Sequence, residues 1–211
     1  LAIVAGGESR GVSAVLTNAQ AATLAANQSK PLAAVLADMN KESNNVIARS
    51  VYLALGEQAA RGRSGTQNAE AAVRRALRSA GLDDETLVLE NGSGLSRRER
   101  ASARFLGEML AAARRSPFQT AFTDSLPIAG NDGTLKKRFQ NIGSPLRLKT
   151  GTLKNVRALA GYWLPEAPQH PLAIVVLLNS EQSGAYLADL DKLVMQLLPA
   201  AAEANRRPDS P

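Results

Sequence analysis

Residues 146–164, LRLKTGTLKNVRALAGYWL, contain the clearest fold signal in the sequence. This stretch contains two runs of strand length, Leu146–Leu153 and the run that begins at Val156 and ends at Leu164. Only Lys154 and Asn155 separate the runs, and a two-residue link is typical of a tight β-hairpin. The stretch therefore predicts two antiparallel strands joined by a short turn.

A third strand and a C-terminal helix are expected after the hairpin. Leu172–Asn179 is a continuous apolar run of strand length. A helix with one apolar face needs a sheet to cover. We therefore expect an α/β (α+β) architecture, with an antiparallel sheet between this helix on one face and a helical cluster on the other. The residues of the expected apolar helix face are Tyr186, Leu187, Leu190, Leu193, Val194, Leu197 and Leu198.

Upstream of the hairpin the hydrophobic period is mainly helical. Apolar residues recur at intervals of three and four, and Pro and Gly separate the segments. The expected elements are helices over 31–39, 46–56, 65–80 and 99–115, a short strand over Thr86–Glu90, and loops with one short helix over 116–144.

Composition excludes several kinds of chemistry. The chain has 211 residues with no Cys and one His, which excludes thiolate zinc sites and argues against a Ser–His–Asp triad. We therefore expect no metal and no cofactor. No run approaches the ~18 apolar residues of a transmembrane helix, so no membrane span is expected. The net charge of +6 is spread thinly without interleaved aromatic residues, which favours solvated faces over a nucleic-acid site.

Lys149, Thr150 and Gly151, followed by Thr152, form the most informative motif. Glycine weakens a strand but is tolerated where a ligand comes close to the backbone. The lysine supplies a point charge suited to a carboxylate, and the Thr150 hydroxyl can bind the same anion. The Thr152 N–H can point at a developing oxyanion. The alternative is an edge strand with a solvated lysine and a glycine at a bulge.

Ser43 and Asn45 form a second candidate motif at the junction of two expected helices. A serine hydroxyl there could relay a proton, and an asparagine amide could hold a substrate carbonyl. The alternative is a helix cap, because serine and asparagine are both favoured N-cap residues. Only one residue separates the two, so both side chains can face one cleft.

The two motifs together match two of the three motifs of penicillin-recognising serine enzymes, which are Ser-x-x-Lys, Ser-x-Asn and Lys-Thr-Gly. The stretches MNKESNNVIARSVYLALG, ENGSGLSRRERASARFLGEML, DSLPIAGNDGTLKKRF and LKTGTLKNVRALAGYW extend the match. From about Gln28 to about Pro199 the chain resembles the class C penicillin-binding proteins. These are periplasmic D-alanyl-D-alanine carboxypeptidase/endopeptidases of peptidase family S13. The resemblance implies a transpeptidase/beta-lactamase-like fold and a periplasmic location.

The sequence departs from this family in one respect: no serine is followed by a lysine three positions later. In the family that motif lies near the mature N-terminus, and a large insertion precedes Ser-x-Asn. We interpret residues 1–25 as the end of an inserted strand-rich domain, 26–199 as the C-terminal part of the transpeptidase-like domain, and 200–211 as a polar tail. The N-terminal segment, possibly a separate chain, would carry the nucleophile and the first strands. We expect this chain not to fold robustly alone.

The resemblance also implies a mechanism. The absent serine attacks the D-Ala-D-Ala carbonyl of a peptidoglycan stem peptide, and water hydrolyses the acyl-enzyme. Beta-lactams acylate the same serine because they mimic the dipeptide. Ser43 would move a proton towards the leaving amine, and Asn45 would hold the peptide carbonyl and the catalytic lysine. Two alternatives stay open, a beta-lactamase or esterase relative and a non-catalytic peptidoglycan-binding scaffold.

The substrate-binding roles implied by the resemblance fall mainly on the Lys-Thr-Gly strand. Lys149, which counts among the catalytic residues, and Thr150 would bind the terminal carboxylate. Gly151 would let the substrate lie against the strand, and the Thr152 N–H would donate to the oxyanion. Arg97 lies in a block that approaches the peptide side chain, with a solvated arginine as its alternative.

Overall fold

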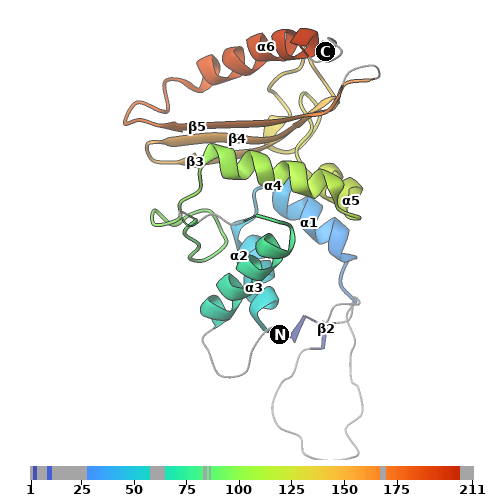
Figure 1. Ribbon diagram of the computed structural model, residues 1–211, viewed down its shortest axis with the longest axis vertical. Helices are drawn as coiled ribbons and strands as arrows, with labels where there is room; N and C mark the ends of the chain where they lie inside the picture. Colours follow the sequence, from blue (N-terminus) through green and yellow to red (C-terminus); the bar gives the residue numbers. More distant parts are fainter. Residues whose placement is uncertain are drawn as a thin grey trace, which may run out of the picture.

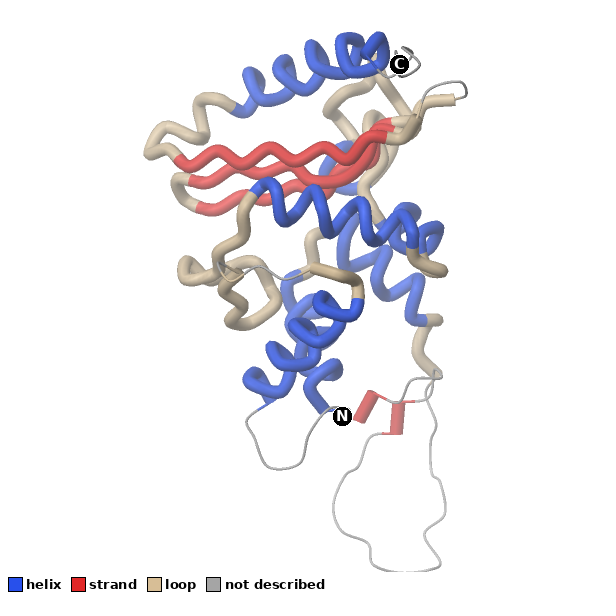
Figure 2. The backbone as a smooth tube through the Cα atoms, in the orientation of Figure 1, coloured by secondary structure: helices blue, strands red, loops and turns tan. Residues whose placement is uncertain are grey.

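The computed structural model describes residues 2–3, 9–10, 28–57, 65–82, 85, 87–166 and 170–204. A three-stranded sheet separates two helical layers (Figure 1). Helix α6 (Leu187–Ala204) lies on one face of the sheet, and α4 (Ala103–Arg115) lies on the other face, with the remaining helices beyond it (Figure 2). These are α1 (Leu32–Lys41), α2 (Asn45–Glu57), α3 (Gly65–Ser79) and α5 (Gln119–Ser125). The 3-10 turn η1 (Gly133–Leu135) lies beside β3, and its Leu135 joins the core that α6 covers.

The sheet confirms the three predicted strands. They are β3 (Leu146–Leu153), β4 (Val156–Trp163) and β5 (Leu172–Asn179), antiparallel in the order β3-β4-β5. Strand β4 ends one residue earlier than predicted. The two-residue link is also confirmed, because Leu153 pairs with Val156 across Lys154 and Asn155. Asn155 has a φ of 68°, in the left-handed region. The hairpin therefore fixes the register of the Lys-Thr-Gly strand.

The main core lies between the sheet and α6. Leu146 and Leu148 of β3 are fully buried and cluster with Val194 and Leu198 of α6. Because successive side chains of a strand point to opposite faces, Lys149 is directed away from this core. Because the two leucines pack against α6, the Lys149 side chain lies on the opposite face of the sheet, which α4 covers.

The predicted strand over Thr86–Glu90 is wrong. In the described part of this segment, Val88 forms only an isolated bridge with Arg100, and Thr86 lies outside the described residues. The Glu99 carboxylate accepts the backbone N–H groups of Glu90, Asn91 and Gly92. A side chain thus occupies donors that a longer strand would have used for pairing.

The helix predicted over 99–115 begins later, at Ala103. The Ser102 hydroxyl caps it by accepting the Phe105 N–H at 3.0 Å. The short helix predicted within 116–144 is confirmed as α5, and η1 adds a 3-10 turn.

Most of the predicted N-terminal region and the end of the tail fall outside the described residues. Of residues 1–25, only an antiparallel pairing of β1 (Ala2–Ile3) with β2 (Ser9–Arg10) is described. The boundaries at 25 and 199 remain predictions. Across the described ranges, every helix is too short or too polar to span a bilayer.

Candidate functional site

The structure brings the two candidate motifs together. The Nζ atom of Lys149 donates a hydrogen bond to the Ser43 Oγ atom at 2.5 Å, although the residues are 106 positions apart. Nζ also donates to the Thr150 carbonyl at 2.7 Å. Burial lowers the pKa of Lys149 from its usual 10.5, because a charged ammonium loses hydration there. A partly desolvated ammonium in contact with a hydroxyl is suited to exchanging a proton with it.

In the turn between α1 and α2, one residue caps helix α2 and a neighbouring residue contacts Lys149. The Asn44 side-chain oxygen accepts the N–H groups of Val46 and Ile47 at 3.1 and 3.0 Å, so Asn44 caps α2. Ser43 has φ of 51°, in the left-handed region. Asn45 is exposed and begins α2. The cap hydrogen bonds therefore come from the residue between the two motif positions, and the Ser43 hydroxyl contacts Lys149 instead.

Asn44→Ala is predicted to destabilise the protein by about 1 kcal/mol, because it removes both hydrogen bonds at the start of α2. Asn44→Asp is the matched control, since it keeps the acceptor and places a negative charge at the helix N-terminus. Chemical denaturation of both variants measures the difference. Equal stability of Asn44→Ala and the parent would show that this cap contributes nothing.

The outer edge of β3 is hydrogen-bonded to another segment at its start and is unpaired, among the described residues, at its Lys-Thr-Gly end. The Leu148 N–H donates to the Pro127 carbonyl, and the Ala129 N–H donates to the Leu146 carbonyl. Since residues two apart direct their backbone groups to the same side, the N–H groups of Thr150 and Thr152 also face this outer edge. Among the described residues no backbone group pairs with them. The Lys-Thr-Gly end of β3 is thus open to a further extended segment.

Gly151 has a packing reason as well as a possible functional one. A Cβ atom at this position would lie 3.2 Å from the Cβ of Ala158, its partner on β4. That separation is tighter than ordinary van der Waals contact. Glycine here lets the two strands keep their spacing, and its predicted role in substrate approach stays a prediction.

Arg97 reaches the other end of the same strand. Its Nη2 atom donates to the Lys154 carbonyl in the β3–β4 turn at 2.9 Å. It also lines a cavity of about 820 Å³ with Phe105 of α4 and Leu153 of β3. The structure therefore places Arg97 beside the hairpin turn at Lys154, which is five residues after Lys149 in the sequence, and at a cavity that is mainly apolar.

Two residues of the 128–135 loop make contacts that the sequence did not predict. Asp132 forms an ion pair with Lys41 and accepts the Ile128 N–H at 2.8 Å. The Thr150 hydroxyl donates a hydrogen bond to the Thr134 hydroxyl at 2.9 Å. No spacing rule predicts these contacts, because the partners come from distant parts of the chain.

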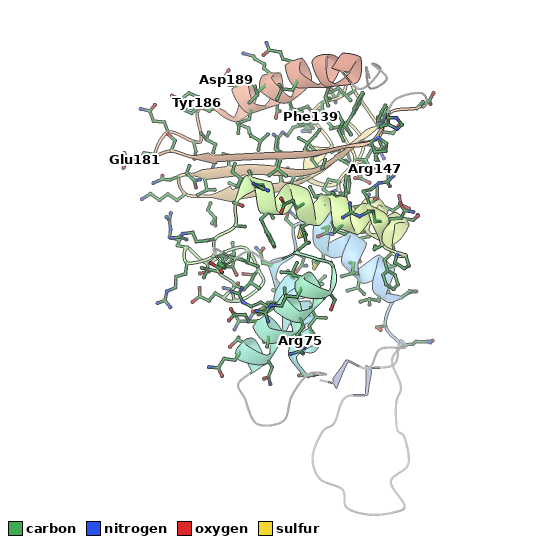
Figure 3. The ribbon with its side chains drawn as sticks, viewed as in Figure 1. Arg75, Phe139, Arg147, Glu181, Tyr186 and Asp189 are labelled. Carbon is green, nitrogen blue, oxygen red and sulfur yellow. The ribbon has the colours of Figure 1, made fainter. Side chains whose placement is uncertain are left out.

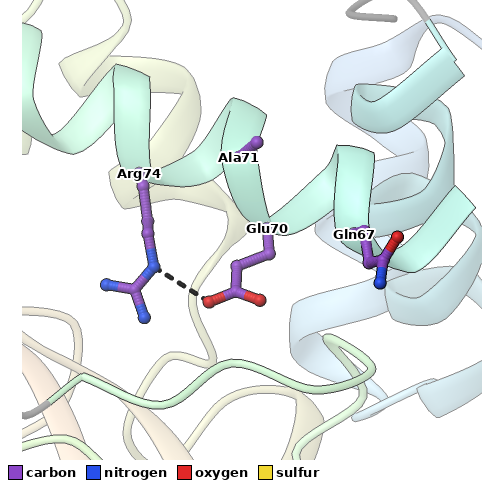
Figure 4. A pocket seen from close by; sticks show the side chains of 4 residues that line it. All are labelled: Gln67, Glu70, Ala71 and Arg74. Atoms are coloured by element: carbon purple, nitrogen blue, oxygen red, sulfur yellow. Dashed lines mark hydrogen bonds and ion pairs between the residues drawn. The ribbon is translucent and has the colours of Figure 1, made fainter. Parts of the chain in front are cut away.

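Several other charged residues have structural partners. A hollow on α3 contains the Glu70–Arg74 ion pair (Figure 4), and Arg74 also donates to the Leu87 carbonyl at 2.6 Å. Arg138 pairs with Asp191 of α6. Figure 3 shows the labelled Arg75 and Arg147 on separate parts of the molecule. These four arginines therefore do not form a single binding face.

Proteins of known structure share the fold of this chain. The chain is similar to a solved structure of penicillin binding protein 4 (dacB) from Haemophilus influenzae, complexed with a beta-lactam. The TM-score is 0.69 at 31% identity, over 83% of this chain and 43% of that one. A penicillin G-acylated predatory endopeptidase of Bdellovibrio bacteriovorus shares the fold, with a TM-score of 0.66 at 20% identity over 88% of this chain and 49% of that one. The fold is therefore that of penicillin-recognising serine peptidases.

Sequence comparison gives the family. The chain belongs to the D-Ala-D-Ala carboxypeptidase 3 (S13) family, which it matches over residues 5–197. It is 34% identical to a D-alanyl-D-alanine carboxypeptidase of an Actinomadura species over 185 residues, which are 84% of this chain and 34% of that protein. It is 39% identical to carboxypeptidase DacB of Mycolicibacterium smegmatis over 147 residues, 66% of this chain and 32% of that protein. The chain thus spans about a third of the length of these relatives, and the predicted resemblance is confirmed.

Proposed function

We propose that this chain forms part of a penicillin-sensitive serine D-Ala-D-Ala carboxypeptidase/endopeptidase that acts on peptidoglycan stem peptides. The nucleophilic serine and its lysine lie outside this chain, on a segment that together with it makes the complete protein. The observation that carries the proposal is the hydrogen bond between Lys149 and Ser43, which unites the Lys-Thr-Gly and Ser-x-Asn motifs. Family membership and the similarity to a protein solved with a beta-lactam support it.

In this proposal the two motifs act on different parts of the substrate. Lys149 and Thr150 bind the terminal carboxylate through an ammonium and a hydroxyl. Ser43, in contact with the ammonium, moves a proton towards the leaving amine. The exposed Asn45 amide holds the peptide carbonyl. The reaction is an acyl transfer: the serine ester forms as D-alanine leaves with a proton, and water then breaks the ester.

The open edge of β3 supports an extended binding mode. A peptide that adds a strand to an exposed sheet edge gains main-chain hydrogen bonds. The outward N–H groups of Thr150 and Thr152 suit that addition, and the Thr152 N–H would meet the oxyanion. Arg97, at the far end of β3, would then lie near the substrate side chain.

The remaining segment has two places to attach. Strand β5 is the other edge of the described sheet, and it is an apolar eight-residue strand. The cavity bounded by α3, α4 and the β3–β4 hairpin is mainly apolar. Because unpaired apolar edges favour association, we expect the absent segment to cover β5 and fill this cavity. We propose a periplasmic location, because the substrate of this function is the cell wall.

A fluorescent penicillin tests the proposal. We expect the label on the segment with the Ser-x-x-Lys motif in the complete protein, read on a denaturing gel beside intact masses. The 22.2 kDa chain alone should take no label. Label on this chain itself would make one of its own serines the nucleophile. A complete protein that takes no label would favour the non-catalytic peptidoglycan scaffold, and rapid release of the label would favour a beta-lactamase or esterase.

A further inference from the structure

The loop between α5 and β3 follows the outer edge of the Lys-Thr-Gly strand. It first pairs with the strand through the Pro127 carbonyl and the Ala129 N–H. It then turns through η1, which brings the exposed Thr134 hydroxyl within 2.9 Å of the Thr150 hydroxyl. Backbone pairing thus ends where this side-chain contact begins.

The same loop is fixed to the Ser43 turn from its other side. Asp132 forms an ion pair with Lys41, at the last residue of α1 and two positions before Ser43. Its second oxygen accepts the Ile128 N–H at 2.8 Å. Gly133 packs so closely that a Cβ there would lie 2.6 Å from the Lys41 carbonyl oxygen. The position of Thr134 is therefore set by contacts on both sides.

We propose that Thr134 is a positioning residue that orients the Thr150 hydroxyl towards the substrate carboxylate. This inference rests on the proposed function, because it assigns a residue to the carboxylate site of that function. Each hydroxyl can donate one hydrogen bond and accept others. When a carboxylate lies beside Thr150, the Thr150 O–H turns to the anion, and Thr134 donates its own hydrogen to the Thr150 Oγ atom.

Such a chain strengthens the terminal hydrogen bond, since donation to Thr150 polarises its O–H bond. The effect depends on the ligand's negative charge. A ligand whose terminal carboxylate is replaced by an uncharged amide gains little from it. Discrimination between the two ligands is therefore the property that Thr134 should control.

The test uses equilibrium binding of a D-alanine-terminated peptide and of its C-terminal amide, by calorimetry, to the complete protein with its nucleophilic serine changed to alanine so that neither ligand is cleaved. Thr134→Val, which removes the hydroxyl and keeps the shape, should weaken binding of the carboxylate peptide by about three- to tenfold and leave amide binding unchanged. Thr134→Ser, the matched control, should bind both ligands within about twofold of the parent. Because Thr134 is exposed, neither change threatens folding.

Asp132→Asn gives an independent variant. It keeps an oxygen for the Ile128 N–H but removes the charge that pairs with Lys41. We expect the same selective loss of carboxylate binding, because Thr134 is no longer held in place. Equal weakening of both ligands by Thr134→Val, or no weakening of either, would overturn the proposal.

The outcomes separate this inference from the proposed function. A parent protein that distinguishes carboxylate from amide but takes no penicillin label would refute the enzymatic proposal and still allow Thr134 to be judged by the variants. A parent that binds both ligands equally would refute the role of Thr134, whatever the result of the labelling.

Discussion

Lys149→Ala in the complete protein is expected to reduce acylation by penicillin by about 100-fold or more. The change removes the ammonium that contacts Ser43 and that we assign to the substrate carboxylate. Loss of one partner from a partly buried, charge-assisted interaction costs about 2–5 kcal/mol. The second-order rate constant of acylation, measured with a fluorescent penicillin, gives the effect directly.

Lys154→Ala is the matched control for this prediction. Lys154 lies in the turn of the same hairpin and is exposed, and its contact with Arg97 uses the backbone carbonyl. Its removal changes the net charge of the protein as Lys149→Ala does. We expect acylation within about twofold of the parent, as for most surface substitutions. Equal losses in the two variants would mean that general charge, and not the position of Lys149, governs the reaction.

The pH dependence follows from the lowered pKa of Lys149. Carboxylate binding needs the protonated ammonium, so acylation should persist below the Lys149 pKa and fall as the pH rises through it. Burial lowers that pKa, so the fall should begin below pH 10.5. The second-order rate constant reports the free protein, where this shift applies. An alkaline limb that is unchanged in Lys149→Ala would assign it to another group.

Much of the fold could be predicted because the decisive signals are local. The hairpin follows from two apolar runs and a two-residue link, and the last helix follows from its apolar period. The segment around Val88 could not be predicted in this way. Its backbone N–H groups bind the carboxylate of Glu99, nine residues after Glu90, and strand propensity contains no information about such a competitor.

The candidate site also contains residues that the sequence identified and residues that it did not. Lys149 and Ser43 were identified from residue chemistry and from a family resemblance, and the structure brings them into contact. Asn44, Asp132 and Thr134 were not identified as contributors. Asn44 was hidden between two motif residues that are equally good caps, and the other two act through partners that only the tertiary fold brings near. Short motifs therefore identify groups that act directly more readily than groups that position them.

The second large effect is expected at Gly161, where β4 crosses beside β3. Gly161 pairs with Leu148, and a Cβ at this position would lie 2.1 Å from the Arg147 carbonyl oxygen and 2.9 Å from the Leu148 Cα. Both obstacles are backbone atoms of the strand that carries Lys149, so relief requires the strands to separate. We expect Gly161→Ala to destabilise the complete protein by about 3 kcal/mol or more.

Gly107→Ala is the control, since it makes the same chemical change inside α4, where an added Cβ meets nothing within 4 Å. Alanine there should raise stability by about 0.5–1 kcal/mol, because it restricts the unfolded chain and favours helix. Urea unfolding of the two variants shows whether the free energy of unfolding falls in Gly161→Ala and rises in Gly107→Ala. Gly161→Ala should also slow penicillin acylation, because a displaced β3 moves Lys149 away from Ser43. A Gly161→Ala protein with the parent's unfolding midpoint would show that β3 and β4 can separate at no cost, and the site would then not depend on their register.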